Sequence, residues 1–184
     1  IIMAKTTDLN QVQEEARAFP AHFKTLNLGT VAADGTPEAS YAPYVKLNGC
    51  YYVYLSDLAK HCANLKANGM CSVLFIESEA DSANVFARKR LTLKCQAQGC
   101  ERGSEKFEQV LDLFEERFGN FIQVIRKLND FHLFELRSQA GSYVAGFAKA
   151  YTLSGDDMGD IQHRNEVGHQ AQDRKTQDRM DALS

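Results

Sequence analysis

Two of the five histidines, His163 and His169, lie in a C-terminal stretch, residues 151–184, that is polar and holds few apolar residues. A histidine there has little apolar material to pack against. We therefore expect His163 to lie at the surface and His169 to be either a surface residue or a ligand. A neutral imidazole is the commonest metal ligand in proteins, so the choice between these two interpretations of His169 largely decides the function.

The spacing of these two histidines limits how they act together. Six residues of α-helix correspond to a rotation of about 600°, which places His163 and His169 on nearly opposite faces. Helical zinc sites instead use side chains three or four residues apart, which share a face. We therefore do not expect both histidines to bind one metal ion from a regular helix.

Four further residues have the chemistry to bind an anion. Arg88 and Arg90 project from the same face of a predicted strand, and Lys60 and His61 lie at the start of a predicted helix. A guanidinium group binds carboxylates and phosphates through a fork of donors. These residues therefore suit an anionic ligand, and a solvated strand face is the alternative interpretation.

The charge and hydropathy patterns exclude several classes of function. Residues 151–184 hold seven acidic and four basic residues, whereas residues 1–150 hold seventeen of each, so no basic surplus is available to neutralise a nucleic-acid backbone. The longest apolar runs, such as residues 72–76, are far shorter than the roughly 20 residues that span a bilayer. We expect a cytoplasmic protein that binds neither nucleic acid nor membrane.

The five cysteines predict no disulfide framework. They are odd in number and contain no CxxC pair, so reduced and mostly buried thiols fit best. Cys95 and Cys100 are close in sequence, but nothing near them completes a zinc site.

Turn signals and periodicity predict the elements that must position these residues. The dipeptides Asp34-Gly35 and Asn48-Gly49 predict two successive hairpins. Strands are expected at 26–33, 38–45, 51–55, 71–76, 88–97, 131–137 and 141–151, the last two joined by a turn at 138–141. Helices are expected at 8–24, ending near Pro20, and at 56–68, 104–118 and 120–129, the last burying Phe121, Val124, Ile125 and Leu128.

These elements favour one mainly β (α+β) domain. Six or seven strands dominated by hairpins, without a βαβ rhythm, predict a small antiparallel barrel with peripheral helices. We assign the barrel to residues 1–150 and a polar C-terminal tail to residues 151–184.

Specific strings, in this order, sharpen the assignment. They are residues 40–43 (SYAP), 56–65 (SDLAKHCANL), 86–92 (FARKRLT), 116–119 (ERFG), 130–131 (DF) with 133–134 (LF), 146–151, 154–157 (SGDD) and 168–169 (GH). Together they resemble the HutZ/HugZ haem-utilization proteins, a family of the pyridoxamine 5′-phosphate oxidase-like, flavin-binding split-barrel superfamily. The resemblance runs from about residue 20 to 170, and the joint order of the strings is more specific than any one of them.

The resemblance implies a split β-barrel homodimer that binds haem in a cleft between its subunits and opens the ring by an oxygenase-type reaction. It places the axial iron ligand on His169, in Gly168-His169, within the tail. Asp130 matches the acidic residue that accepts a hydrogen bond from the ligand imidazole, which makes the imidazole more electron-donating.

Several alternatives stay open at the level of sequence. Arg88, Arg90, Lys60 and His61 suit haem propionates or the phosphate of FMN equally, so an FMN-dependent oxidoreductase of the same fold is the second hypothesis. A haem storage or delivery protein without turnover is the third. Asp130, at a helix-to-strand junction, is also a common turn residue.

Overall fold

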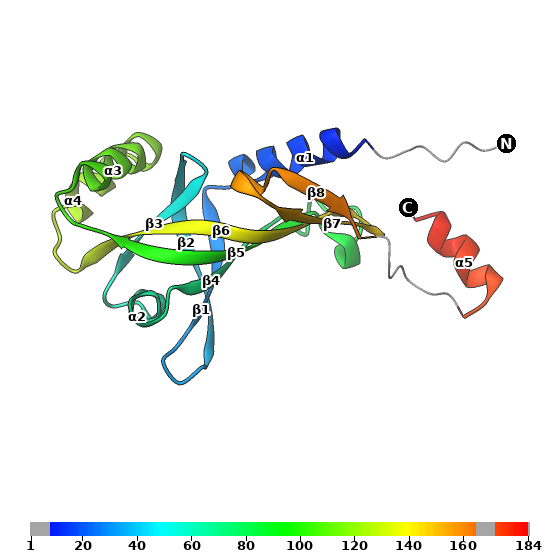
Figure 1. Ribbon diagram of the computed structural model, residues 1–184, viewed down its shortest axis with the longest axis horizontal. Helices are drawn as coiled ribbons and strands as arrows, with labels where there is room; N and C mark the ends of the chain where they lie inside the picture. The colour runs from blue at the N-terminus through cyan, green and yellow to red at the C-terminus, as the bar shows by residue number, and fades with distance from the viewer. Residues whose placement is uncertain (1–7, 165–171, 184) are drawn as a thin grey trace. The chain divides into compact units, whose positions relative to one another are not determined.

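The computed structural model describes residues 8–164 and 172–183, and His169 lies outside them. The α-helices are α1 (Leu9–Ala18), α2 (Lys60–Ala67), α3 (Glu105–Phe118), α4 (Phe121–Ile125) and α5 (Arg174–Asp181), with 3-10 helices η1 (Phe19–His22), η2 (Val85–Ala87) and η3 (Asp156–Met158). The strands are β1 (Thr25–Val31), β2 (Pro37–Leu47), β3 (Cys50–Ser56), β4 (Met70–Ile76), β5 (Arg90–Cys100), β6 (Phe131–Gly146), β7 (Lys149–Ser154) and β8 (Asp160–His163) (Figure 1).

The strands form one sheet that closes on itself. Its order is β3-β2-β1-β4-β5-β6-β7-β8, and an additional antiparallel pairing between β3 and β6 closes a six-stranded barrel, from which β7 and β8 extend. The predicted mainly β split barrel with peripheral helices is confirmed. Both predicted hairpins form, since β1 pairs with β2 and β2 with β3.

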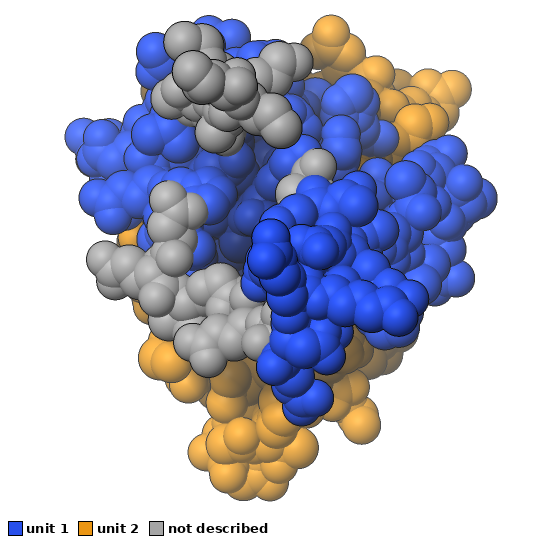
Figure 2. Space-filling model, turned by 90° about the vertical axis from the view of Figure 1, so that its right-hand side faces the viewer, with its two compact units in different colours: residues 1–22, 75–92, 140–184 blue, residues 23–74, 93–139 orange. Residues whose placement is uncertain are grey.

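The chain divides into two compact units, which are described separately (Figure 2). Unit 1 comprises residues 1–22, 75–92 and 140–184, and unit 2 comprises residues 23–74 and 93–139. In unit 1, α1 contacts β8. Within the described parts of both units, no helix is long and apolar enough to cross a membrane.

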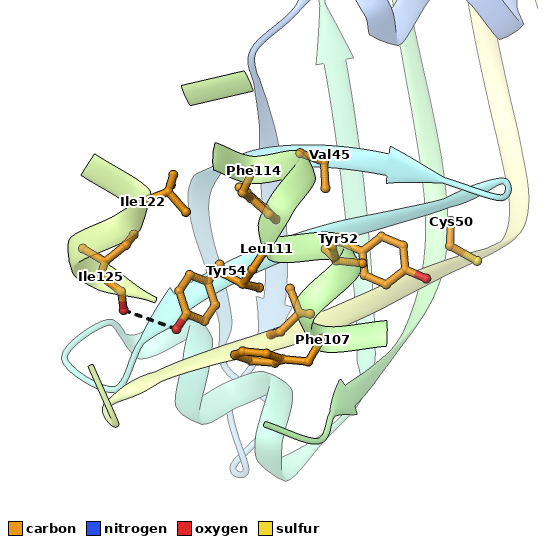
Figure 3. Close-up of a cluster of buried hydrophobic side chains, with 11 residues drawn as sticks. Val45, Cys50, Tyr52, Tyr54, Phe107, Leu111, Phe114, Ile122 and Ile125 are labelled. Carbon is orange, nitrogen blue, oxygen red and sulfur yellow. Dashed lines mark hydrogen bonds between the residues drawn. The ribbon is translucent and has the colours of Figure 1, made fainter. Parts of the chain in front are cut away.

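The core of unit 2 includes a cluster of buried side chains beneath α3 (Figure 3). Ser104 caps this helix by accepting a hydrogen bond from the Phe107 N–H at 3.2 Å, and Gly119 ends it at a φ of 82°. The inner face buries Phe107, Val110, Leu111 and Phe114, at the spacing of one helical face. This confirms the helix predicted over residues 104–118.

The prediction for the next helix is partly wrong. The structure has a helix of only five residues, α4, and just Ile122 and Ile125 are buried. Phe121 is 69% exposed, Val124 62% and Leu128 41%. Ile122 and Ile125 are three residues apart and face the cluster. The other apolar residues of this short helix, Phe121 and Val124, lie on different faces and stay exposed.

The predicted turn at residues 138–141 is absent. β6 runs without interruption from Phe131 to Gly146 because it has antiparallel partners at both ends: β3 pairs with Phe131–Leu136, and β7 pairs from Gly141 onward. The reversal comes later, where Ala148 adopts a φ of 58° between β6 and β7. Continuous pairing therefore overrides the local turn signal.

Candidate functional site

Asp130 occupies the turn directly before β6. Its backbone carbonyl accepts a hydrogen bond from the Asp57 N–H at 2.7 Å, which ties the turn to the end of β3. The side chain is exposed, and its carboxylate has no hydrogen-bond or ion-pair partner among residues 8–164 and 172–183. The turn is thus fixed through its backbone while the carboxylate can accept a hydrogen bond from a further donor.

Arg102 also holds this turn. Its Nη1 donates to the carbonyl of Arg126 at 3.1 Å, and its Nη2 donates to the carbonyls of Leu128 at 2.8 Å and Phe131 at 2.6 Å. The planar guanidinium has enough fixed donors for these carbonyls, which bracket Asp130 along the chain. Sequence reasoning missed Arg102, because no motif marks a residue whose partners are backbone carbonyls more than twenty positions away.

A small ion-pair cluster anchors the start of β6. His132 Nε2 lies 2.9 Å from Asp57 Oδ2, and Lys66 also pairs with this carboxylate. Hydrogen bonds from Lys66 and His132 lower the pKa of Asp57 to about 2, so it stays ionised at neutral pH. Because the Asp57 N–H also binds the Asp130 carbonyl, this cluster supports the position of Asp130.

Lys60 and His61 form the first turn of α2 in unit 2. Lys60 is exposed and has no hydrogen-bond or ion-pair partner within the described ranges. His61 is partly buried, and this desolvation lowers the pKa of its imidazole against a weaker opposing effect of Glu38. His61 is therefore neutral at pH 7, and the exposed Lys60 side chain is available to an anionic group.

Arg88 and Arg90 lie together in unit 1, but not as the sequence predicts. Arg88 precedes β5 instead of projecting from it, so the predicted shared strand face is wrong. Its Nε donates to the Glu77 carbonyl at 2.9 Å, its Nη2 donates to the same oxygen, and its Nη1 lies 3.9 Å from Glu79. Arg90 Nη1 donates to the Arg88 carbonyl at 3.1 Å. Arg88 thus joins the ends of β4 and β5.

His163 is partly buried, whereas the sequence predicts a surface residue. It ends β8, where Tyr151 of β7 is its register partner, and the two rings meet edge to face with centroids 4.9 Å apart. The His163 Nδ1 is buried and has no hydrogen-bond partner among the described residues. The surface prediction is therefore partly wrong, because β7 pairs with β8 and the His163 ring packs against the buried Tyr151.

The candidates are divided between the two compact units. Asp130, Lys60 and His61 belong to unit 2, and Arg88 and Arg90 belong to unit 1. The predicted ligand, His169, falls outside the described residues. Within the described residues, no three histidine, cysteine or acidic side chains are grouped to hold a metal ion.

The closed six-stranded barrel with peripheral helices places the chain in the class of split-barrel proteins. Comparison with known proteins identifies the family within that class. Residues 12–145 match the family "Pyridoxamine 5'-phosphate oxidase". "Heme oxygenase HutZ" of Vibrio cholerae is 43% identical over 159 residues, which is 86% of this chain and 90% of that protein. The chain belongs to the pyridoxamine 5′-phosphate oxidase-like superfamily and, within it, to the family of HutZ-type haem-utilization proteins.

Solved structures agree with this assignment. The crystal structure of ChuZ from Campylobacter jejuni is 33% identical with a TM-score of 0.79, covering 90% of this chain and 68% of that one. The structure of HutZ from Vibrio cholerae, described as a heme storage protein, is 39% identical with a TM-score of 0.68, covering 76% of this chain and 97% of that one. The family resemblance of the sequence motifs is confirmed.

Proposed function

We propose that this protein binds haem and degrades it oxidatively, releasing the iron for use by the cell. The observation that carries the proposal is the Asp130 turn, whose backbone is fixed by Arg102 and Asp57 while its carboxylate has no partner in the described residues. The proposal is also supported by the similarity of most of this chain to a protein named as a heme oxygenase.

In this proposal His169 is the iron ligand and Asp130 accepts a hydrogen bond from the other ring nitrogen of His169. Such a carboxylate fixes the tautomer of a ligand imidazole and makes it more electron-donating. Bound haem would supply an iron centre able to react with oxygen. Asp130 contributes by orienting the imidazole, and Arg102 contributes by holding Asp130.

The cationic residues suit the carboxylates of haem. Lys60 has no partner among the described residues, and a lysine near a neutral His61 offers a donor to a propionate. We assign Arg90 the same role in unit 1, where Arg88 supports it by accepting its Nη1 hydrogen bond. Arg88 donates two N–H groups to the Glu77 carbonyl, so its guanidinium is poorly placed to bind a phosphate through two parallel hydrogen bonds.

A hemin titration tests the ligand assignment. Purified protein should develop a Soret band when hemin is added, and His169→Ala should abolish it or shift it strongly. His163→Gln is the matched control, since it removes the other tail histidine and should leave the band in place. Circular dichroism verifies that both variants are folded. A His169→Ala spectrum identical to that of the wild type refutes the assignment.

The second candidate is an FMN-dependent oxidoreductase, and the observation that favours it is the family match over residues 12–145. This candidate predicts a yellow protein with bound FMN after purification. A colourless preparation that does not bind added FMN excludes it.

The third candidate, haem storage without turnover, would use the same ligand and the same cations. It is favoured by the description of the structurally similar HutZ as a heme storage protein. Because binding is common to storage and degradation, only the fate of bound haem under reducing, aerobic conditions separates them.

We further propose that the working form is a cytoplasmic homodimer with haem in the cleft between subunits. Large apolar side chains that are exposed in the single chain, such as Phe86 at 90% and Tyr41 at 67%, are consistent with a partner surface. Light scattering coupled to size-exclusion chromatography should give twice the monomer mass. A monomer at micromolar concentration contradicts the dimer.

A further inference from the structure

Cys71 on β4 and Cys95 on β5 stand directly opposite each other. The Ala97 N–H donates to the Gly69 carbonyl at 2.7 Å, so Gly69 and Ala97 are opposite each other in the antiparallel pairing. Moving two residues forward from Gly69 and two residues back from Ala97 places Cys71 opposite Cys95. A Cβ on Gly69 would lie 2.6 Å from the Ala97 oxygen, so only glycine permits this approach. The close contact fixes the register beside the cysteines.

The pairing has the same register at its other end. At the far end of the pairing, the Glu77 N–H donates to the Lys89 carbonyl at 2.9 Å, and this pair lies an even number of steps from Cys71 and Cys95. The two cysteines are therefore a hydrogen-bonded pair, for which the Cα atoms are about 5.5 Å apart. Disulfides form over Cα separations of about 4.4–6.8 Å, so no backbone movement is needed.

The side chains of the two cysteines lie on the same face of the sheet. Opposite residues of an antiparallel pair project to the same face, and both side chains are buried, at 9% and 3% exposure for Cys71 and Cys95. The Cys71 sulfur lies 3.7 Å from the Cys95 carbonyl oxygen, and the Cys95 sulfur lies 3.8 Å from the Ser138 hydroxyl. Both cysteines are reduced in this structure.

A groove in unit 2 borders the pair. It has a volume of about 760 Å³, and its walls come from β1, β2, β4, β5 and β6. Cys71 and Cys95 both line it, beside Thr30 and Ser72. Low exposure therefore restricts the oxidant to a small molecule such as a peroxide.

We propose that Cys71 and Cys95 form a peroxide-responsive dithiol, which hydrogen peroxide or another small hydroperoxide converts into a disulfide across β4 and β5. The thiolate of one cysteine attacks a peroxide oxygen, the O–O bond breaks, and a sulfenic acid forms with loss of water or the corresponding alcohol. The sulfur of the second cysteine then attacks the sulfenic sulfur, an S–S bond forms, and water leaves. Two thiols are oxidised by two electrons as one peroxide is reduced.

The hydrogen bond between the thiols favours Cys95 as the attacking sulfur. It lowers the pKa of Cys95 and raises that of Cys71, so Cys95 is the first to become a thiolate. Cys71 then acts as the resolving thiol. This chemistry needs neither haem nor His169 and is therefore independent of the proposed haem-degrading function.

Intact mass spectrometry of the full chain without added haem tests the proposal. Reduced protein is treated with a small molar excess of hydrogen peroxide, denatured and alkylated. Two of the five thiols should become resistant to alkylation, the mass before alkylation should fall by 2 Da, and peptide mapping should find the bridge between Cys71 and Cys95. Five alkylated thiols, a bridge between other cysteines, or a gain of 32 Da on one cysteine overturns the proposal.

Two kinds of variant separate this pair from the other cysteines. Cys71→Ala and Cys95→Ala should each lose the 2 Da shift completely, whereas Cys100→Ala, which removes the least buried cysteine, should retain it. The mapping on the wild-type chain decides the question even where an alanine variant fails to fold. A 2 Da shift that persists in folded Cys71→Ala also refutes the assignment.

Discussion

The two carboxylates at the start of β6 differ in a way that separates structure from function. Glu135 lies within the strand, is 6% exposed and accepts hydrogen bonds from three side chains, whereas Asp130 lies just before it and is exposed without a partner in the described residues. A buried charge must be satisfied inside the protein, but an exposed one is free to meet a ligand group. Local surroundings thus mark Glu135 as structural and Asp130 as the functional candidate.

The partners of Glu135 explain its charge state. Burial alone would raise the pKa of Glu135, but hydrogen bonds from Lys106 at 3.0 Å, Tyr52 at 2.8 Å and Arg137 at 3.0 Å reverse the effect and hold the pKa at about 2. The carboxylate stays ionised throughout the physiological range and joins β3, α3 and β6.

The largest expected effect is on stability, from Glu135→Ala. Loss of the carboxylate leaves the buried Tyr52 hydroxyl without its acceptor, while Lys106 and Arg137 turn to solvent, so we expect a loss of about 1.5–3 kcal/mol. Urea unfolding measures it. Glu101→Ala, at an exposed position nearby, is the control and should change stability by less than about 0.5 kcal/mol. Equal effects of the two variants contradict a structural role for Glu135.

The same carboxylate predicts a pH dependence. Because the folded pKa of about 2 is below the ordinary 4.5, the unfolded state binds the proton first, and stability falls as the pH decreases from about 4.5 toward 2. Thermal unfolding between pH 5 and pH 3 should therefore decline more steeply for the wild type than for Glu135→Gln. Parallel curves mean that Glu135 is not stabilised as an anion.

Asp130→Asn should impair function and leave stability unchanged, which is the reverse of the effect expected for Glu135→Ala. The substitution keeps size and turn propensity, so urea unfolding should be unchanged within about 0.5 kcal/mol. Loss of a carboxylate behind a ligand histidine commonly costs about 10- to 100-fold in metal affinity or activity, which hemin titration and turnover assays detect. A destabilised variant with normal haem binding would reverse the comparison and make Asp130 the structural residue.

Arg102→Ala tests how the Asp130 turn is held. Three backbone carbonyls lose their donor at a solvent-accessible site, so we expect a stability loss of about 1 kcal/mol together with weaker haem binding. Arg102→Lys is the matched variant, since it keeps the charge but its single ammonium group cannot replace the fork. Full recovery in the lysine variant shows that charge alone matters.

The smallest expected effect comes from His61. Desolvation lowers its pKa in the folded state, so below about pH 6.5 the unfolded state takes up the proton more readily and stability declines. Thermal unfolding of His61→Gln should show a slightly weaker decline between pH 7 and pH 5.5 than the wild type. If the stability of His61→Gln declines more steeply than that of the wild type as the pH falls, the protein stabilises the charged imidazole, and the His61 pKa is raised instead of lowered.

The sequence was sufficient to predict those elements whose structure depends on residues within the element or next to it. The helix over residues 104–118 follows from its apolar spacing, the Ser104 cap and the Gly119 stop, and the first two hairpins follow from their turn dipeptides. The alternating buried face of β5 was predicted for the same reason. These signals depend on neighbours a few positions away.

Other features depend on partners distant in sequence and could not be predicted. Arg102 meets carbonyls of another segment, Arg88 binds the carbonyl of Glu77, and His163 packs on Tyr151 only because β7 and β8 pair. A strand partner likewise made β6 continuous. The candidate ligand His169 rests on family motifs alone, and it stays a prediction.

The most direct test of the central claim is the fate of haem bound to the wild-type protein. Haem-loaded protein is given ascorbate in air-saturated buffer, with a ferrous-iron chelator present, and the Soret band is followed against an anaerobic control. Oxidative degradation predicts that the band decays only in air while chelated iron appears in proportion. A Soret band that persists in air, without iron release, contradicts degradation and identifies a storage protein.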